Sequence, residues 1–262
     1  MSEEQPFESL GLPPAAPEPE AAPPPAPERY PFWGYPDLAL FAGMLIASAV
    51  AAMTLVSVIL SVLHVQVQAK VAEALAVQCL IYALAFAALA LLFRVQYQRP
   101  FWHSLGWTGF RVPPLMVVIC GVLTAFGVAA VSVLLRTPST SNRITELLED
   151  PKAMVPVAIF GLTLAPLAEE LGFRGFLQPL LVRSLGPVPG VLATAIPFGL
   201  LHFQEYGNSW RHALLISLAG AAFGWMRHRT GSTMASTLMH ASYNALFFVF
   251  AYFTQQKDSP HS

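Results

Sequence analysis

Charge is scarce in this chain of 262 residues. Only 11% of the residues are charged and 55% are hydrophobic, whereas roughly 25% of the residues in soluble domains are charged. This composition argues against a water-soluble domain. The 14 lysines and arginines are balanced by 15 aspartates and glutamates, so no basic field is left to neutralise the phosphates of a nucleic acid. We therefore expect a protein that works in a lipid bilayer and does not bind nucleic acid.

Cysteine is almost absent. Cys79 and Cys120 are the two cysteines, and both lie inside apolar runs. Two cysteines without metal-type spacing provide neither a disulfide framework nor a zinc motif. We interpret them as small packed residues.

The first 36 residues have little from which a hydrophobic core could form. Proline and alanine alternate with glutamate between Pro13 and Glu28, which is typical of a disordered or polyproline-like tail. Acidic residues stand where a secretory signal peptide has its basic start, so we interpret this stretch as a spacer. The predicted organisation is a tail at 1–36 followed by a membrane bundle at 37–262.

Long uncharged runs occupy most of the remaining chain. The run 38–63 carries no charged residue, and at about 1.5 Å per helical residue it can cross a hydrocarbon core of about 30 Å. Six further apolar stretches follow, at 74–93, 115–135, 153–168, 188–203, 213–226 and 233–253. A separate crossing at 167–182 would raise the number of spans from seven to eight. The pattern predicts an all-α, polytopic membrane bundle of about seven to eight transmembrane helices.

The loops between these spans add three expectations. Basic residues are divided nearly equally between alternate loops, so the positive-inside rule leans only weakly toward a cytoplasmic tail. The loop 136–152 is predicted to hold a short amphipathic helix at the membrane surface. Gly220 and Gly224 form a Gly-x-x-x-Gly pair, which lets a neighbouring helix approach closely.

The first polar interruption of the apolar pattern is Glu169 and Glu170, with Arg174 four residues after the second carboxylate. A charge near the bilayer centre costs roughly 2.5 to 3.5 kcal/mol, so these groups should face protein or a hydrated cavity. On a helix Glu170 and Arg174 share a face and can neutralise one another. Glu169 points elsewhere and is left for proton chemistry. The structural alternative is a helix end with solvated charges.

Two more interruptions follow on later spans. His202 lies near the end of an apolar run and follows Phe198 by four residues. A lone histidine there is more often a hydrogen-bonded structural residue than a catalyst. His240 and Asn244 lie four apart on a charge-free helix, and they should look inward because lipid would leave their donors and acceptors unpaired.

Charged residues in the short loops beside the late spans receive no chemical role, because solvation is cheap there. They are Glu205, His212, Arg227, His228 and Arg229.

The motifs Glu-Glu-x-x-x-Arg, Phe-x-x-x-His and His-x-x-x-Asn occur in this order within a polytopic chain. The ordered set resembles the CAAX prenyl protease and bacteriocin-processing family, also called the abortive-infection or CPBP intramembrane endopeptidases. The resemblance covers 153–253. It implies an all-helical endopeptidase whose catalytic groups meet in a water-filled cavity and act on substrates presented at the membrane.

The resemblance also implies a role for each motif residue. Glu169 looks like the general base that activates water, assisted by His202, and His240 and Asn244 look like the groups that stabilise the oxyanion. The supporting residues are the ion pair of Glu170 and Arg174, and Phe198 as packing beside the water-activating histidine.

The residue chemistry is compatible with these roles, because peptide hydrolysis needs a base for water, a proton donor for the leaving amine and donors for the oxyanion. A covalent nucleophile has no support, since there is no Gly-x-Ser-x-Gly elbow and neither cysteine is beside a histidine in sequence. Attack by water is the preferred hypothesis. The expected partners are the lipid bilayer and a protein or peptide substrate, lipid-modified or not.

Zinc remains an open cofactor, because Glu169, His202 and His240 are also the ligand types of a catalytic zinc site. No His-Glu-x-x-His helix is present, and we favour the metal-independent glutamate version without committing to a cofactor. We locate the protein as a multi-pass integral protein of a bacterial cell membrane, from its alanine- and proline-rich composition.

Three other function classes stay open. The first is a catalytically silent membrane binding or immunity protein of the same family, against which the intact set of polar residues argues. The second is a haem carrier with His202 and His240 as axial ligands, which leaves Glu169, Glu170 and Asn244 unexplained. The third is a transporter, although the two halves show no evident repeat.

Overall fold

A computed structural model describes residues 29–64, 70–138 and 151–258. All regular elements in these ranges are helices, which confirms the all-α prediction. In chain order they are α1 (Tyr35–Val62), α2 (Lys70–Gln96), α3 (Phe101–Ser104), α4 (Pro114–Leu134), α6 (Pro151–Leu162), α7 (Leu164–Glu170), the π-helix η1 (Leu171–Leu177), α8 (Gln178–Leu185), α9 (Pro187–Leu201), α10 (Trp210–Thr230) and α11 (Thr233–Asp258). The proposed surface helix in 136–152 and most of the tail lie outside the described residues.

Four segments are long and apolar enough to cross a membrane: Tyr35–Val62, Val71–Gln96, Pro114–Leu134 and Ala153–Leu185. The last of these runs from α6 through α8, so the stretches 153–168 and 167–182 belong to one crossing and not to two. α9 is a shorter apolar helix, and α10 and α11 have 21 and 26 residues but carry more polar side chains. The protein is thus a multi-pass helical membrane bundle.

Proline shapes the helices that surround the polar residues. Pro36 and Pro114 lie in the first turn of α1 and α4, where a missing backbone N–H costs nothing. The segment from α6 to α8 is broken at Thr163, which has non-helical dihedral angles, three residues before Pro166. The ring of a proline inside a helix clashes with the preceding turn, and this break separates α6 from α7.

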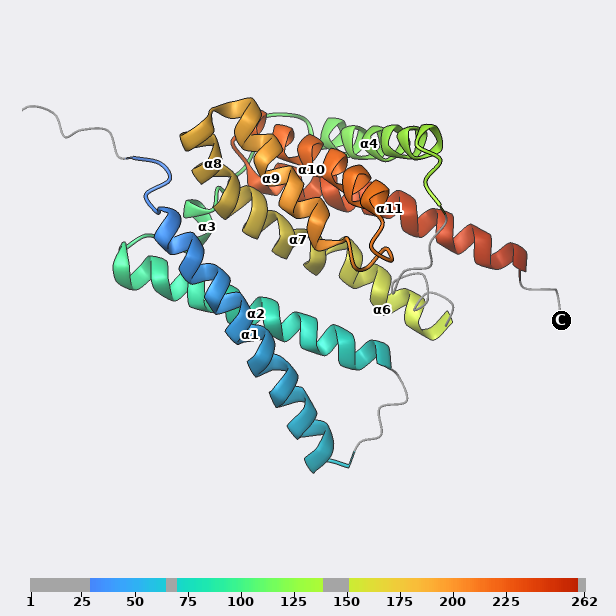
Figure 1. Cartoon of the computed structure of the whole chain (residues 1–262), viewed down its shortest axis with the longest axis horizontal. Coiled ribbons are helices and arrows are strands. Elements are labelled where there is room, and N and C mark those ends of the chain that lie inside the picture. Colours follow the sequence, from blue (N-terminus) through green and yellow to red (C-terminus); the bar gives the residue numbers. More distant parts are fainter. Residues whose placement is uncertain (1–28, 65–69, 139–150, 259–262) are drawn as a thin grey trace, which may run out of the picture.

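One end of the bundle gathers the start of α1, the end of α2, α3, the ends of α8 and α10, and the start of α11; we call it the α3 end. Three long-range contacts define it. Tyr30 donates to the carbonyl of Ser104, Arg183 donates to the carbonyl of Pro31, and the amide of Thr233 donates to the carbonyl of Gly106 at 2.8 Å. In Figure 1 this end lies at the left.

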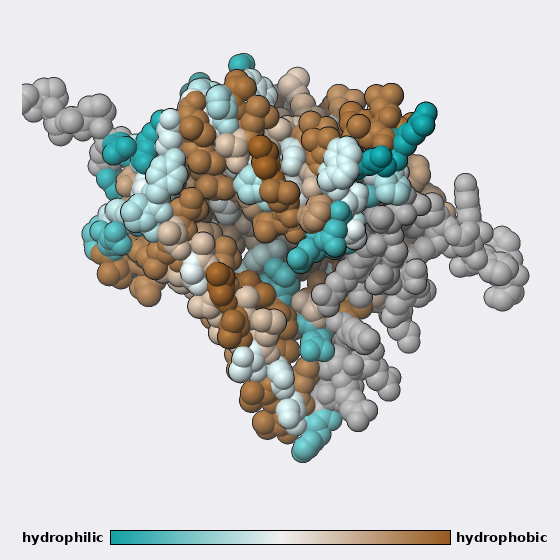
Figure 2. Space-filling view, viewed as in Figure 1, coloured by the Kyte–Doolittle hydropathy of each residue, from teal (hydrophilic) through white to brown (hydrophobic). Residues whose placement is uncertain are grey.

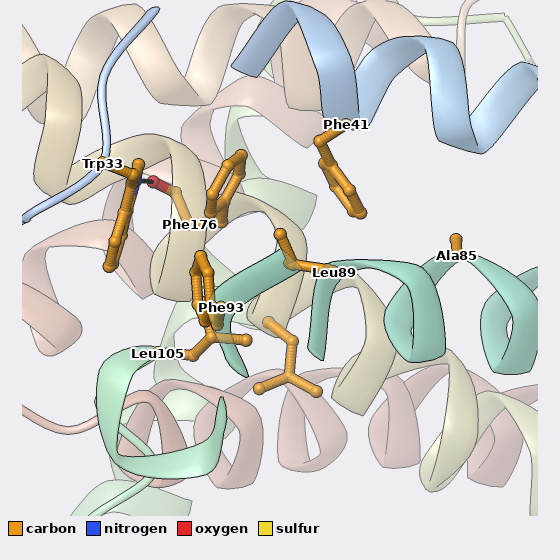
Figure 3. Packing of buried hydrophobic residues seen from close by; sticks show 8 residues of the cluster. Trp33, Phe41, Ala85, Leu89, Phe93, Leu105 and Phe176 are labelled. Carbon is orange, nitrogen blue, oxygen red and sulfur yellow. Dashed lines mark hydrogen bonds between the residues drawn. The ribbon is translucent and has the colours of Figure 1, made fainter. Parts of the chain in front are cut away.

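An aromatic cluster packs beneath the α3 end (Figure 3). Trp33 is fully buried, and its ring stacks on Phe93 of α2 at 5.2 Å and on Phe176 of η1 at 5.3 Å. Its indole N–H also donates to the carbonyl of Phe176 at 3.1 Å. Trp33 lies inside the stretch 1–36 that we predicted as a tail, yet it joins this cluster because a large aromatic ring gains much by burial. Residues 29–34 therefore pack with the bundle, while the domain division itself stays a prediction.

Candidate active site

A fully buried ion pair occupies the junction of α7 and η1. Nη1 of Arg174 lies 2.9 Å from Oε1 of Glu170, and neither side chain is exposed. Nη2 of Arg174 donates to the carbonyl of Gly220 at 2.7 Å, and the guanidinium lies 4.2 Å from the ring centroid of Phe198. Pairing, an extra hydrogen bond and an aromatic face together offset the cost of burying this charge. The pair expected from the sequence spacing forms, inside the bundle and away from its surface.

The glycine pair on α10 allows this approach. The carbonyl of Gly220 accepts from Arg174 and that of Gly224 accepts from Gln178 at 2.9 Å. A Cβ added at Gly220 would come within 2.8 Å of the Phe198 ring, and one at Gly224 within 2.6 Å of Gln178. Side chains at these two positions would push α8 and α9 away from α10.

His240 of α11 lies between the two adjacent glutamates. Its Nδ1 is 3.0 Å from Oε1 of Glu170, and its Nε2 is 3.9 Å from Oε2 of Glu169. The ring stacks on Phe223 with centroids 4.6 Å apart, and Phe198 contacts it edge to face at 5.8 Å. Because the ionised carboxylate of Glu170 can only accept, a hydrogen bond at 3.0 Å places the proton on Nδ1. The other ring nitrogen is thereby directed toward Glu169.

The two glutamates have different surroundings. Glu170 is fully buried, whereas 24% of the Glu169 side chain is exposed. Glu169 lies within electrostatic reach of Arg174, while Arg174 makes its ion pair with Glu170. One carboxylate is thus enclosed and paired, and its neighbour can meet water.

His202 caps the carboxyl end of α9 and is half-buried. Its Nδ1 lies 2.9 Å from the carbonyl oxygen of Phe198, one turn earlier. A carbonyl accepts, so Nδ1 carries the proton and Nε2 is the basic nitrogen of the neutral ring. The Phe198 ring contacts His202, with centroids 5.3 Å apart, as well as His240 and Arg174, and so it lies among all three motifs.

Asn244 has a different position from the other polar residues. It follows His240 by one turn on α11, and its Nδ2 donates to the carbonyl of Gly161 at 2.9 Å. Gly161 lies at the end of α6, next to the break at Thr163. This hydrogen bond fastens α11 to the break, with one N–H of the carboxamide; the second N–H is the group that could serve an oxyanion.

Glu205 is a site residue that the sequence interpretation missed. It lies in the turn between α9 and α10, within electrostatic reach of both His202 and Glu169. Burial raises the pKa of the Glu205 carboxyl above its ordinary value, while the interaction with His202 lowers it and the interaction with Glu169 raises it. Its position three residues after His202 is the signal that could have indicated it. The loop location instead suggested an ordinary solvated charge.

Tyr82 of α2 is a second residue near the candidate site that the sequence interpretation missed, and it has no sequence signal. Its ring stacks on Phe160 of α6 at 6.2 Å with an interplanar angle of 1°, and its hydroxyl lies within electrostatic reach of Glu169 and Glu205. A tyrosine inside an apolar run is indistinguishable from core packing until the helices are placed.

A metal site was the alternative use of Glu169, His202 and His240. Among the residues that the structure covers, no three His, Cys, Asp or Glu side chains lie close enough together to hold a metal ion. The three candidate ligands therefore do not fit a zinc site in this arrangement.

Comparison with protein families bears on the same part of the chain. Residues 151–246 match the Rce1-like family, described as type II CAAX prenyl endopeptidase Rce1-like. The matched segment contains all three motifs, and the match confirms the resemblance to CAAX prenyl proteases. Searches of curated proteins and of solved structures return no match.

The family that this segment matches is, by its description, a family of prenyl endopeptidases. Elements α6 to α11 supply every residue of the three motifs, and α1, α2 and α4 lie outside the match.

Proposed function

We propose that this protein is an intramembrane endopeptidase that hydrolyses a peptide bond of a membrane-associated protein or peptide, with water activated by Glu169. The observation that carries the proposal is His240, held between a buried carboxylate and a partly exposed one. The imidazole is oriented by Glu170, and Glu169 is left facing it with access to water.

Glu169 acts as the general base. The 3.9 Å between its Oε2 and Nε2 of His240 exceeds direct hydrogen-bond length and leaves room for a bridging oxygen. The carboxylate takes a proton from water as the water oxygen bonds to the carbonyl carbon of the substrate. Nε2 of His202 assists by accepting from the same water.

His240 acts on the carbonyl oxygen. When protonated on both nitrogens, its ring donates from Nδ1 to Glu170 and from Nε2 to the developing oxyanion. Glu170 and Arg174 are positioning residues, because they hold the ring without touching the substrate. The second N–H of Asn244 is the additional donor.

The reaction is complete when the C–N bond of the substrate's peptide group breaks. The proton taken by Glu169 passes to the leaving amine, one peptide bond and one water molecule are consumed, and a carboxylic acid and an amine are released. General acid–base catalysis of this kind contributes about 10²- to 10⁴-fold.

The family description names a prenyl endopeptidase, and a lipid-modified peptide is therefore the first substrate class to test, beside the same peptide without the lipid. The helical spans support a bilayer location. A bacterial cell membrane is the source that the alanine- and proline-rich composition favours.

The deciding experiment compares the membrane proteomes of cells that express the wild type or Glu169→Ala at equal levels. A cleavage fragment should disappear in the variant. Glu73→Gln is the matched control, because Glu73 is an exposed acid at the start of α2. If no fragment distinguishes the wild type from Glu169→Ala under any growth condition, the chain is the silent binding protein and the proposal fails.

A further inference from the structure

A second polar site lies at the α3 end, and it shares Arg174 with the candidate active site. It is a pocket of about 230 Å³ between α8, the last turns of α10 and Tyr30. Ligand pockets usually measure about 300 to 1,000 Å³, so this one suits a small group or the tip of a larger molecule. All charged or titratable side chains along its wall other than Tyr30 are basic: Arg174, Arg183, Arg227 and His228.

The segment that precedes α1 holds two of these arginines in place. Arg227 donates from Nε to Oγ1 of Thr233 at 3.0 Å and from Nη2 to the hydroxyl of Tyr30 at 3.1 Å. Arg183 donates from Nη1 to the carbonyl of Pro31. The acceptors are neutral, so these hydrogen bonds fix the direction of both arginines without supplying a counter-charge.

No carboxylate of the described chain forms an ion pair with Arg183 or Arg227. Arg227 is nevertheless only 8% exposed, and Arg29 adds a further positive charge near Arg183. Buried charges are normally paired, because burial without a counter-ion is costly. Like charges drawn together around one pocket raise that cost further, and an anion in the pocket would remove it.

Two side chains that line the pocket have polar atoms without a hydrogen-bond partner among the described residues. Gln178 is 2% exposed and its Nε2 donates to Gly224, but its Oε1 has no hydrogen-bond partner among the residues described. Nε of the fully buried Arg174 likewise has none within this part of the chain. Buried polar groups are rarely left unpaired.

Membrane topology alone does not explain this cluster of basic residues. Basic residues near a membrane surface often serve the positive-inside preference, and exposed Arg229, two residues after Arg227, fits that explanation. Arg227 differs because it is buried and held by side-chain hydrogen bonds. A preference for basic residues at the membrane surface would not explain why Arg227 is buried. Nor would it explain why polar atoms of Gln178 and Arg174 lack hydrogen-bond partners among the described residues.

We propose that this pocket binds a phosphate group, carried by an anionic phospholipid headgroup or free in solution. Arg183 and Arg227 donate to the phosphate oxygens, and His228 adds a third donor. The α3 end is a hydrophilic edge beside apolar surface, as Figure 2 shows at the left of the view, which is where a headgroup lies.

The test uses the full chain purified in an uncharged detergent, with binding followed as the rise in unfolding temperature. The probes are inorganic phosphate, a short-chain phosphatidylglycerol and a short-chain phosphatidylcholine, with chloride at matched ionic strength. We expect phosphate or phosphatidylglycerol to raise the unfolding temperature of the wild type, and Arg183→Gln to weaken that binding by about tenfold or more. Arg229→Gln removes an equal charge outside the pocket and should bind as the wild type does.

The same experiment distinguishes the two sources of the phosphate group, a lipid headgroup and free phosphate. Stabilisation by phosphatidylglycerol but not by inorganic phosphate assigns a lipid headgroup, and stabilisation by both assigns the phosphate group itself. The proposal fails if neither probe exceeds chloride, or if Arg183→Gln and Arg229→Gln lose binding equally. Arg183 is half-buried, so the Arg183→Gln variant should fold. The unfolding temperature of this variant without ligand checks that it does. Proteolytic activity does not enter the result.

Discussion

The two halves of the bundle differ in how much of their apolar helices is buried. In the amino-terminal half, α1 and α2 cross about midway along their lengths (Figure 1), and only 11% of the most apolar part of each helix is buried. In Ala153–Leu185 the buried share is 28%, and its interior face carries an ion pair. The side chains of the first region are mostly suited to contact with lipid. The side chains of the second region are more often packed against neighbouring helices, and the proposed catalytic Glu169 lies there beside the buried ion pair.

Removing one member of the buried ion pair should give the largest difference in stability between the two regions. Arg174→Gln leaves Glu170 charged and fully enclosed, and unpairing a buried ion pair costs about 3 to 5 kcal/mol. Ile46→Ala on α1 is the control, because Ile46 is 69% exposed and such changes stay within about 0.5 kcal/mol. Unfolding in detergent measures both. Equal losses for the two variants would show that the halves are stabilised alike.

Glu169→Gln separates catalysis from stability inside the second region. The variant should lose about 100-fold or more in kcat/KM, because the amide cannot take a proton from water. Its unfolding midpoint should stay near that of the wild type, since Glu169 is partly exposed and does not hold Arg174 directly. Activity on the identified substrate, measured beside thermal unfolding, checks both. Retained activity would remove Glu169 from the mechanism.

Glu205→Gln should show a smaller, pH-dependent effect. Burial raises the pKa of Glu205, so the folded state binds this proton more tightly than the unfolded state does. The stabilising contribution is present below the unfolded pKa of about 4.3 and is lost as the pH rises through the raised value. The variant should therefore gain stability relative to the wild type across that window. A difference between the two unfolding midpoints that is independent of pH would contradict the placement of Glu205.

Chelation should have the smallest effect of all. Because Glu169, His202 and His240 do not form a three-ligand cluster, exhaustive chelation should leave the rate of peptide cleavage within about twofold, as expected for general acid–base chemistry. The measurement is the rate before and after treatment, followed by addition of zinc. Loss of activity that zinc restores would establish the metal mechanism instead.

Local spacing was sufficient to predict several contacts. The four-residue separations of Glu170 from Arg174 and of Phe198 from His202 become an ion pair and a ring contact, because residues four apart on a helix share a face. Long uncharged runs likewise predicted the bundle. The crossing Ala153–Leu185 was harder to delimit, since its prolines looked like boundaries between spans and the π-helix has no sequence rule of comparable strength.

The residues missed are those whose role depends on distant partners. Trp33 looked like the end of a tail, and Glu205 and Arg227 looked like solvated loop charges. Each lies where it does because of helices that are far away in sequence: Phe176 for Trp33, Glu169 for Glu205, and Tyr30 for Arg227.

By itself the amino-acid sequence determined the helical, membrane-embedded character of this protein and the order of its three polar motifs, because hydropathy and helical periodicity act within one segment. Only the tertiary structure decided that His240 meets both glutamates and that arginines from α8 and α10 surround one pocket. The physical reason is that electrostatic and hydrogen-bond energies depend on distances between segments, and helix packing sets those distances after each helix has formed.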